Sequence, residues 1–185
     1  MPDGIDENIK KAIELLVEAT ARLAEQYFQM PVAGRENPIY RERIYCYELY
    51  HLMRQQWPDD FPYSLMGEID KTKHPLIRGG ALDESKPDFL FHVPGNMDSN
   101  LLVVEVKPCN ARKRDIQHDL QKLTTFCKDA QYKVALYLFY GNEQVGLKAK
   151  IREAAKDDDK IDLTRILFYH HQTPMNRAER IEINS

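Results

Sequence analysis

The sequence predicts a three-layer α/β/α domain with a central mixed sheet. Three observations predict it: helical periodicity early in the chain, a hairpin of two apolar strands in the middle, and alternating helices and strands after the hairpin. A hairpin pairs its strands antiparallel, whereas a strand, helix, strand succession pairs them in parallel through a crossover. We therefore expect both kinds of pairing in one sheet, with helices on both faces.

Length and composition favour one globular domain over residues 1–185. The chain is 43% hydrophobic and 30% charged with a net charge of −3, which excludes disordered and collagen-like classes. No apolar run approaches the roughly 18 residues that a membrane span needs. The three cysteines form no C-x-x-C pair and the first residues show no secretory signal, so we expect a cytoplasmic protein without structural zinc.

The first 37 residues predict a helical extension. Apolar residues at three- and four-residue steps predict one helix from Ile5 to Met30. A second helix, from Pro38 to Trp57, opens the predicted core, residues 38–140. This helix carries four tyrosines, Tyr40, Tyr45, Tyr47 and Tyr50. Their helical spacing favours packing within the domain over the alternative of a surface that stacks on bases.

The rest of the predicted core holds four strands and one helix. The first strands are Ser64 to Asp70, Pro87 to Val93 and Leu101 to Lys107, with a surface loop before the second and a hairpin turn before the third. A helix from Asp115 to Ala130 and a strand from Tyr132 to Tyr140 follow. Residues 141–185 add a helix from Glu143 to Lys156 and a last strand from Ile161 to His171.

The two hairpin strands carry charges that apolar strands rarely hold. Asp88 lies in the first, and Glu105 and Lys107 in the second, where alternation puts them on one face. Simple pairing would set Asp88 opposite Val106, on the other face. A one-residue slip or bulge near the turn would bring Asp88 level with Glu105 or Lys107. The predicted site therefore depends on the strand register.

Two carboxylates beside a lysine at a strand edge point to metal-assisted hydrolysis. Mg²⁺ and Mn²⁺ prefer hard oxygen ligands and keep several waters. The lysine can hold the attacking water or help to deprotonate it, and the metal neutralises charge on a phosphate. The pattern indicates hydrolysis of a phosphodiester.

The pair Pro87-Asp88, followed seventeen residues after Asp88 by Glu105-Val106-Lys107, resembles the PD-(D/E)xK nuclease superfamily. The predicted order of elements is similar to the αβββαβ core of that restriction-endonuclease-like fold. The resemblance implies that Asp88, Glu105 and the Val106 carbonyl bind Mg²⁺ or Mn²⁺ and that Lys107 positions the water. It also implies a substrate of DNA rather than RNA, a role in restriction, defence or repair, and a homodimer.

The resemblance extends to the flanking helices. Many members add a glutamate from the helix before the first strand; Glu48 is the candidate, with Glu68 on the first strand as its competitor. Some place a glutamine or lysine on the helix after the motif, where Gln121 or Lys122 would fit. Local charge predicts a phosphate-binding surface as an alternative to an ordinary solvated helix start. Its candidates are Lys86, Arg112, Lys113, Arg114, Gln121 and Lys122.

A second hypothesis comes from another functional class. A catalytically silent protein could keep the fold and act as a binding subunit of a larger complex. The acidic net charge and the lack of a recognisable DNA-reading module favour it. Ion pairing of Lys107 away from an open cleft would add weight to this hypothesis.

Overall fold

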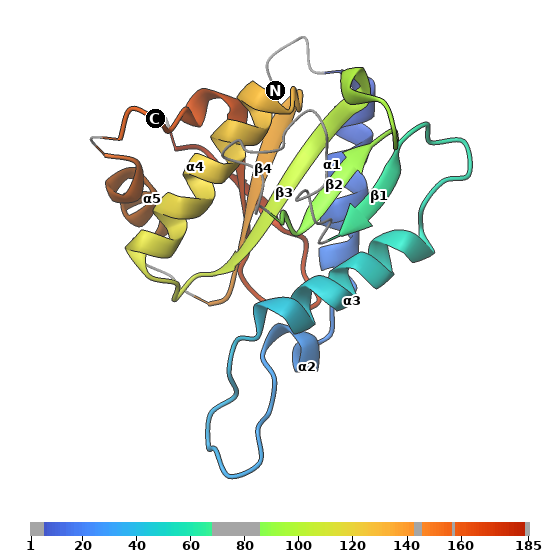
Figure 1. Cartoon of the computed structure of the whole chain (residues 1–185). Helices are drawn as coiled ribbons and strands as arrows, with labels where there is room; N and C mark the ends of the chain where they lie inside the picture. The colour runs from blue at the N-terminus through green and yellow to red at the C-terminus, as the bar shows by residue number, and fades with distance from the viewer. Residues whose placement is uncertain (1–5, 68–85, 143–145, 157, 184–185) are drawn as a thin grey trace.

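The computed structural model describes residues 6–67, 86–142, 146–156 and 158–183 (Figure 1). Its strands are β1 (Ser64–Gly67), β2 (Phe89–His92), β3 (Asn100–Pro108), β4 (Val134–Tyr140), β5 (Ile166–His171) and β6 (Glu179–Ile181). Its α-helices are α1 (Glu7–Thr20), α2 (Glu25–Phe28), α3 (Glu42–Gln55), α4 (Lys113–Asp129) and α5 (Leu147–Ala155). No helix in these ranges combines the length and apolarity needed to cross a bilayer.

All six strands join one mixed sheet in chain order, β1 to β6. Strand β2 pairs antiparallel with β1 and β3, and β5 pairs antiparallel with β6. The central pairs, β3 with β4 and β4 with β5, are parallel. The predicted α/β class and the mixed pairing are therefore confirmed, and the parallel strands lie in the middle, where both faces are covered.

The sheet separates two hydrophobic cores (Figure 1). Helices α1, α2 and α3 pack on one face against side chains that include Val104 and Val106. Helices α4 and α5 pack on the other face, against Val103 and Tyr137 among others. Because side chains alternate along a strand, β3 supplies both cores and leaves Glu105 and Lys107 on the α4 face.

The prediction of one helix from Ile5 to Met30 was wrong. Helix α1 ends at Thr20 and α2 begins at Glu25. The Thr20 hydroxyl donates to the carbonyl of Val17 at 2.6 Å and accepts the N–H of Ala178 at 2.8 Å, so the helix end is tied to the C-terminal segment. The apolar pattern ran through the break because Leu23, which is fully buried, belongs to the same core as α1.

The strand predicted from Ile161 to His171 is present as β5, but it begins at Ile166 and is not the last strand, because β6 follows it. Glu179 and Arg180 of β6 are exposed and Ile181 is half-buried, so this short edge strand left little apolar signal. The segment predicted from Ser64 to Asp70 is described only to Gly67. Glu68 and all but the last residue of the surface loop predicted over residues 71–86 lie outside the described residues.

Candidate active site

The register of the hairpin brings the two motif carboxylates level. Phe89 pairs with Val104 and Phe91 with Leu102, but His92 pairs with Asn100, so the strands are offset by a bulge at Leu101. Continuing the pairing of Phe89 by one residue sets Asp88 opposite Glu105. The one-residue slip on which the predicted site depends is therefore present, and it places Asp88, which directly precedes β2, beside Glu105 of β3.

Asp88 also caps the part of β3 that runs beyond β2. The pairing of β2 begins at Phe89, whereas β3 continues to Pro108. The Asp88 Oδ2 atom accepts a hydrogen bond from the N–H of Val106 at 2.7 Å. In an extended strand, the N–H and C=O of one residue point to the same side. The Val106 carbonyl therefore also faces the Asp88 side of β3.

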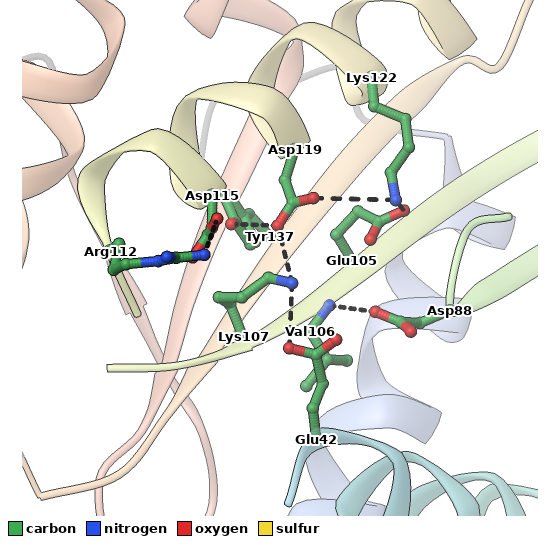
Figure 2. A network of polar contacts seen from close by, with 10 residues as sticks. All are labelled: Glu42, Asp88, Glu105, Val106, Lys107, Arg112, Asp115, Asp119, Lys122 and Tyr137. Carbon is green, nitrogen blue, oxygen red and sulfur yellow. Dashed lines mark hydrogen bonds and ion pairs between the residues drawn. The ribbon is translucent and has the colours of Figure 1, made fainter. Parts of the chain in front are cut away.

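A chain of ion pairs surrounds this point, as Figure 2 shows. The ion pairs join Glu42, Glu105, Lys107, Asp119 and Lys122. Together with Asp88, which accepts the Val106 N–H beside them, we call this group the carboxylate–lysine network. Lys107 Nζ lies 3.0 Å from Glu42 Oε2 and 3.1 Å from Asp119 Oδ2. Lys122 Nζ lies 2.7 Å from Glu105 Oε1 and 3.8 Å from Asp119 Oδ1. Strand β3 and helices α3 and α4 are thus connected through charged side chains.

Asp119 is the branch point of the network. Its carboxylate contacts both lysines and accepts a hydrogen bond from the Tyr137 hydroxyl of β4 at 2.8 Å. Burial and the charge of Asp119 raise the pKa of Tyr137, so the phenol stays protonated and remains a donor. Asp119 is only 4% exposed. Its buried carboxylate holds Lys107 and Lys122 relative to each other and to β4.

The two motif acids are electrostatically unsatisfied. Burial raises the pKa of Asp88 to about 6; the Val106 N–H opposes this shift and the charge of Glu42 adds to it. Burial and the neighbouring charge of Asp88 raise the pKa of Glu105, although Lys122 opposes them. Glu105 is 2% exposed. Both acids would thus gain from a further positive charge nearby.

The pKa values of the two lysines are also raised, which for a lysine favours the charged form. Burial lowers the pKa of Lys107, but the charges of Asp119 and Glu42 outweigh it, so its pKa rises. The pKa of Lys122 also rises, because Glu105 and Asp119 outweigh burial. Both side chains therefore carry a full positive charge at neutral pH. With four carboxylates and two ammonium groups, the fully ionised network would hold two uncompensated negative charges.

Helix α3 brings Glu42, and not Glu48, to Lys107. The two glutamates are six residues apart, which places them about 120° apart around the helix axis. Glu42 lies in the first turn and Cys46, one turn later, is buried. Glu42 was not predicted as a site residue, because the sequence does not show which side of this helix packs toward β3.

Helix α4 supplies Lys122 to the network, whereas Gln121 donates to Asp158 Oδ2 at 2.8 Å. Of the two alternatives, only Lys122 contacts a motif residue. Asp119 was not predicted as a site residue, although its position in the sequence is unusual for an acid. It lies three residues after Ile116 and four before Leu123, on the apolar stripe of the predicted helix, where an acid needs a partner.

Acids already contact four of the six candidates for the predicted phosphate-binding surface, Gln121 included. Arg112 pairs with Asp115 and Lys113 with Glu153, both at 2.9 Å, and Lys122 pairs with Glu105. Lys86 and Arg114 are exposed. The prediction of this surface stays a prediction, and the paired cations would have to exchange partners to contact phosphates.

The donors near Asp88 fit a hydrated divalent ion. Within the described ranges, no three His, Cys, Asp or Glu side chains are placed to hold a metal together. Mg²⁺, however, is usually held by one or two carboxylates and keeps several waters. Asp88, Glu105 and the Val106 carbonyl supply hard oxygens, and burial raises the pKa values of both acids, so a cation nearby would stabilise their charged forms.

Comparisons with known proteins add no family to this picture. No protein-family model matches the chain, and neither a curated protein nor a solved structure matches it.

Proposed function

We propose that the protein is a divalent-metal-dependent nuclease with a restriction-endonuclease-like fold that cleaves DNA. The observation that carries the proposal is the pair of neighbouring acids, half-buried Asp88 and buried Glu105, whose pKa values are raised chiefly by burial and, for Glu105, also by the charge of Asp88. Such a pair is costly to bury without a cation. If all its acids were ionised, the network would hold two excess negative charges, which one divalent ion would neutralise.

Asp88, Glu105 and the Val106 carbonyl would hold the ion. When bound, a divalent ion supplies Lewis acidity for the phosphate and lowers the pKa of a coordinated water. Asp88 has a second task, because its bond to the Val106 N–H fixes the edge of β3 at which the ligands meet.

Lys107 acts in this proposal as a fixed ammonium group. Its raised pKa makes it a poor base, so it orients the attacking water and stabilises charge on the phosphate. Glu42 and Asp119 set the position of Nζ from two helices. Lys107 was expected either to hold the attacking water or to help deprotonate it. Its raised pKa favours the task of holding the water.

A specific observation favours the second candidate function, a catalytically silent binding subunit. Lys107 already pairs with two acids, and its side chain is only 15% exposed. A lysine used only to neutralise Glu42 and Asp119 would look the same. The two functions differ in whether the network accepts a metal and cuts.

The deciding experiment measures cleavage of supercoiled plasmid, linear duplex and single-stranded DNA with Mg²⁺, Mn²⁺ or EDTA. The wild type is compared with Lys107→Ala and with Lys148→Ala, a lysine of α5 on an exposed position. We expect metal-dependent cutting by the wild type and Lys148→Ala, and a loss of at least 100-fold in Lys107→Ala. Equal cutting by all three proteins contradicts the assignment of the site. No cutting, together with no Mg²⁺ binding by calorimetry, favours the silent subunit.

A further inference from the structure

The four tyrosines of the α3 region divide into two pairs. Tyr45 is buried and stacks on Tyr140 with ring centroids 4.0 Å apart, and Tyr40 meets the same ring edge-on at 5.4 Å. Tyr47 is instead 57% exposed, and Tyr50 is half-buried and stacked on Phe89 at 6.4 Å. Packing, the favoured interpretation of the sequence, accounts for Tyr40 and Tyr45. It does not bury the ring of Tyr47, which stays exposed although the Arg43 guanidinium lies 5.9 Å from its centroid.

The other two tyrosines line a pocket of about 220 Å³ beside the candidate metal site. Its lining residues are Cys46, Tyr47, Tyr50, Gly67, Asp88 and Phe89. A Cβ atom at Gly67 would lie 3.2 Å from the Asp88 carbonyl oxygen and 3.8 and 3.9 Å from the rings of Tyr50 and Phe89. Gly67 therefore lies close against the Asp88 backbone, and a side chain at this position would crowd the wall of the pocket.

We infer that this pocket binds a nucleobase of an unpaired nucleotide, next to the phosphate held at Asp88. The inference rests on the proposed function, because Asp88 is both a wall of the pocket and a proposed metal ligand. A base and its 5′ phosphate belong to the same nucleotide, so a base in the pocket places a phosphate within reach of the reacting centre. Aromatic rings accept any base, because each base offers a π-face for stacking.

The pocket selects a class of substrate. A base within a continuous duplex is stacked and paired, and it must leave the stack before it can enter a protein pocket. Arg112, Lys113 and Lys122 would have to leave their acid partners before they could contact the phosphates of a duplex. The preferred substrate is therefore single-stranded nucleic acid, or the single-stranded end or flap of a duplex.

The test separates base binding from phosphate binding. Fluorescence anisotropy measures the affinity of labelled dT12, rU12, a blunt 12-base-pair duplex and an abasic 12-mer that keeps the phosphates but lacks the bases. Ca²⁺ replaces Mg²⁺, because it offers looser oxygen coordination, and gels verify that the oligonucleotides stay intact. The variants are Tyr47→Ala, Tyr47→Phe and the control Met175→Ala, since Met175 is the other large apolar side chain exposed among the described residues.

We expect dT12 to bind at least tenfold more tightly than the duplex and the abasic 12-mer. Tyr47→Ala should weaken dT12 binding about tenfold, whereas Tyr47→Phe and Met175→Ala should stay within twofold of the wild type. Equal affinity for dT12 and the abasic 12-mer overturns the inference, as does wild-type affinity in Tyr47→Ala. A preference for rU12 over dT12 keeps the pocket and assigns it to RNA.

The inference and the proposed function fail in different ways. If dT12 binding depends on Tyr47 but no cleavage occurs in Mg²⁺ or Mn²⁺, the inferred base pocket stands and the proposed nuclease activity is wrong. If cleavage depends on Lys107 but not on Tyr47, with equal rates on duplex and single strand, the nuclease activity stands and the inferred base pocket is wrong.

Discussion

At the scale of single residues, Asp88 combines a structural and a chemical task at a cost in stability. Its pKa lies near 6 because the carboxyl group is buried, whereas the same group in an unfolded chain titrates near 3.8. The native state therefore holds a proton between these pH values that the unfolded state has lost. By linkage, this group favours folding most below pH 4, and the contribution is lost as the pH rises through 6.

Asp88→Asn should remove this dependence. An asparagine oxygen can still accept the Val106 N–H, but it carries no charge. We expect the wild type to lose up to about 3 kcal/mol of stability from this group between pH 4 and pH 8, and the variant to lose less. Metal-free thermal melts across this range measure the difference, and the exposed Asp60→Asn is the control.

Mg²⁺ should stabilise the wild type more at pH 8 than at pH 5. Parallel melting curves for all three proteins would contradict the assignment.

Some site residues could be predicted from the sequence and others could not, for a physical reason. Asp88, Glu105 and Lys107 stood out because charge in an apolar strand is anomalous along the chain itself. Glu42 lies on a helix face where acids are ordinary, so only the packing of α3 reveals its contact with Lys107. Asp119 is unusual for its place on an apolar helix stripe, but its contact with Lys107 likewise follows only from packing. The pocket at Tyr47 likewise needs the approach of α3 to β1 and β2.

At the scale of elements, the rotation of α3 about its axis decides which acid serves the site. The structure turns Glu42 toward Lys107, whereas the resemblance alone suggested Glu48. The element itself was predictable from its periodicity, but its rotation was not. Rotation depends on which residues are buried, and Tyr45, Leu49 and Met53 are the fully buried ones.

Glu42→Gln and Glu48→Gln therefore distinguish the two assignments. Removing the charge of Glu42 loosens Lys107, so we expect cleavage to fall between tenfold and 100-fold, as for other residues that orient a catalytic group. Glu48→Gln should have less than a twofold effect. The same assay with matched unfolding curves checks both variants. The reverse order of effects would restore Glu48 as the third acid of the site.

At the scale of the whole molecule, charge is balanced internally rather than presented as a basic surface. The net charge is −3, and Arg112, Lys113 and Lys122 pair with acids of the same chain. A protein of this kind contacts few phosphates. Its binding to nucleic acid should then come mainly from base contacts, which depend little on salt.

The salt dependence of dT12 binding provides the measurement. Each phosphate neutralised on a single strand contributes about 0.7 to the slope of log affinity against log salt. We expect a slope below about 2 in magnitude between 50 and 200 mM salt, which corresponds to fewer than about three phosphates. A slope of 4 or more would mean that the paired lysines and arginines exchange their partners for the nucleic acid.

The bulge at Leu101 has a consequence for how uniformly the protein folds. Strand β2 is apolar on both sides, with Phe89 and Phe91 in one core and Leu90 in the other. A slip by one residue would exchange phenylalanine for leucine and still bury apolar groups, so the cores alone discriminate weakly between registers. The bulge and the bond from Val106 to Asp88 make that choice. Two preparations with the same circular dichroism could then differ in their active fraction, which only titration of the working sites would reveal.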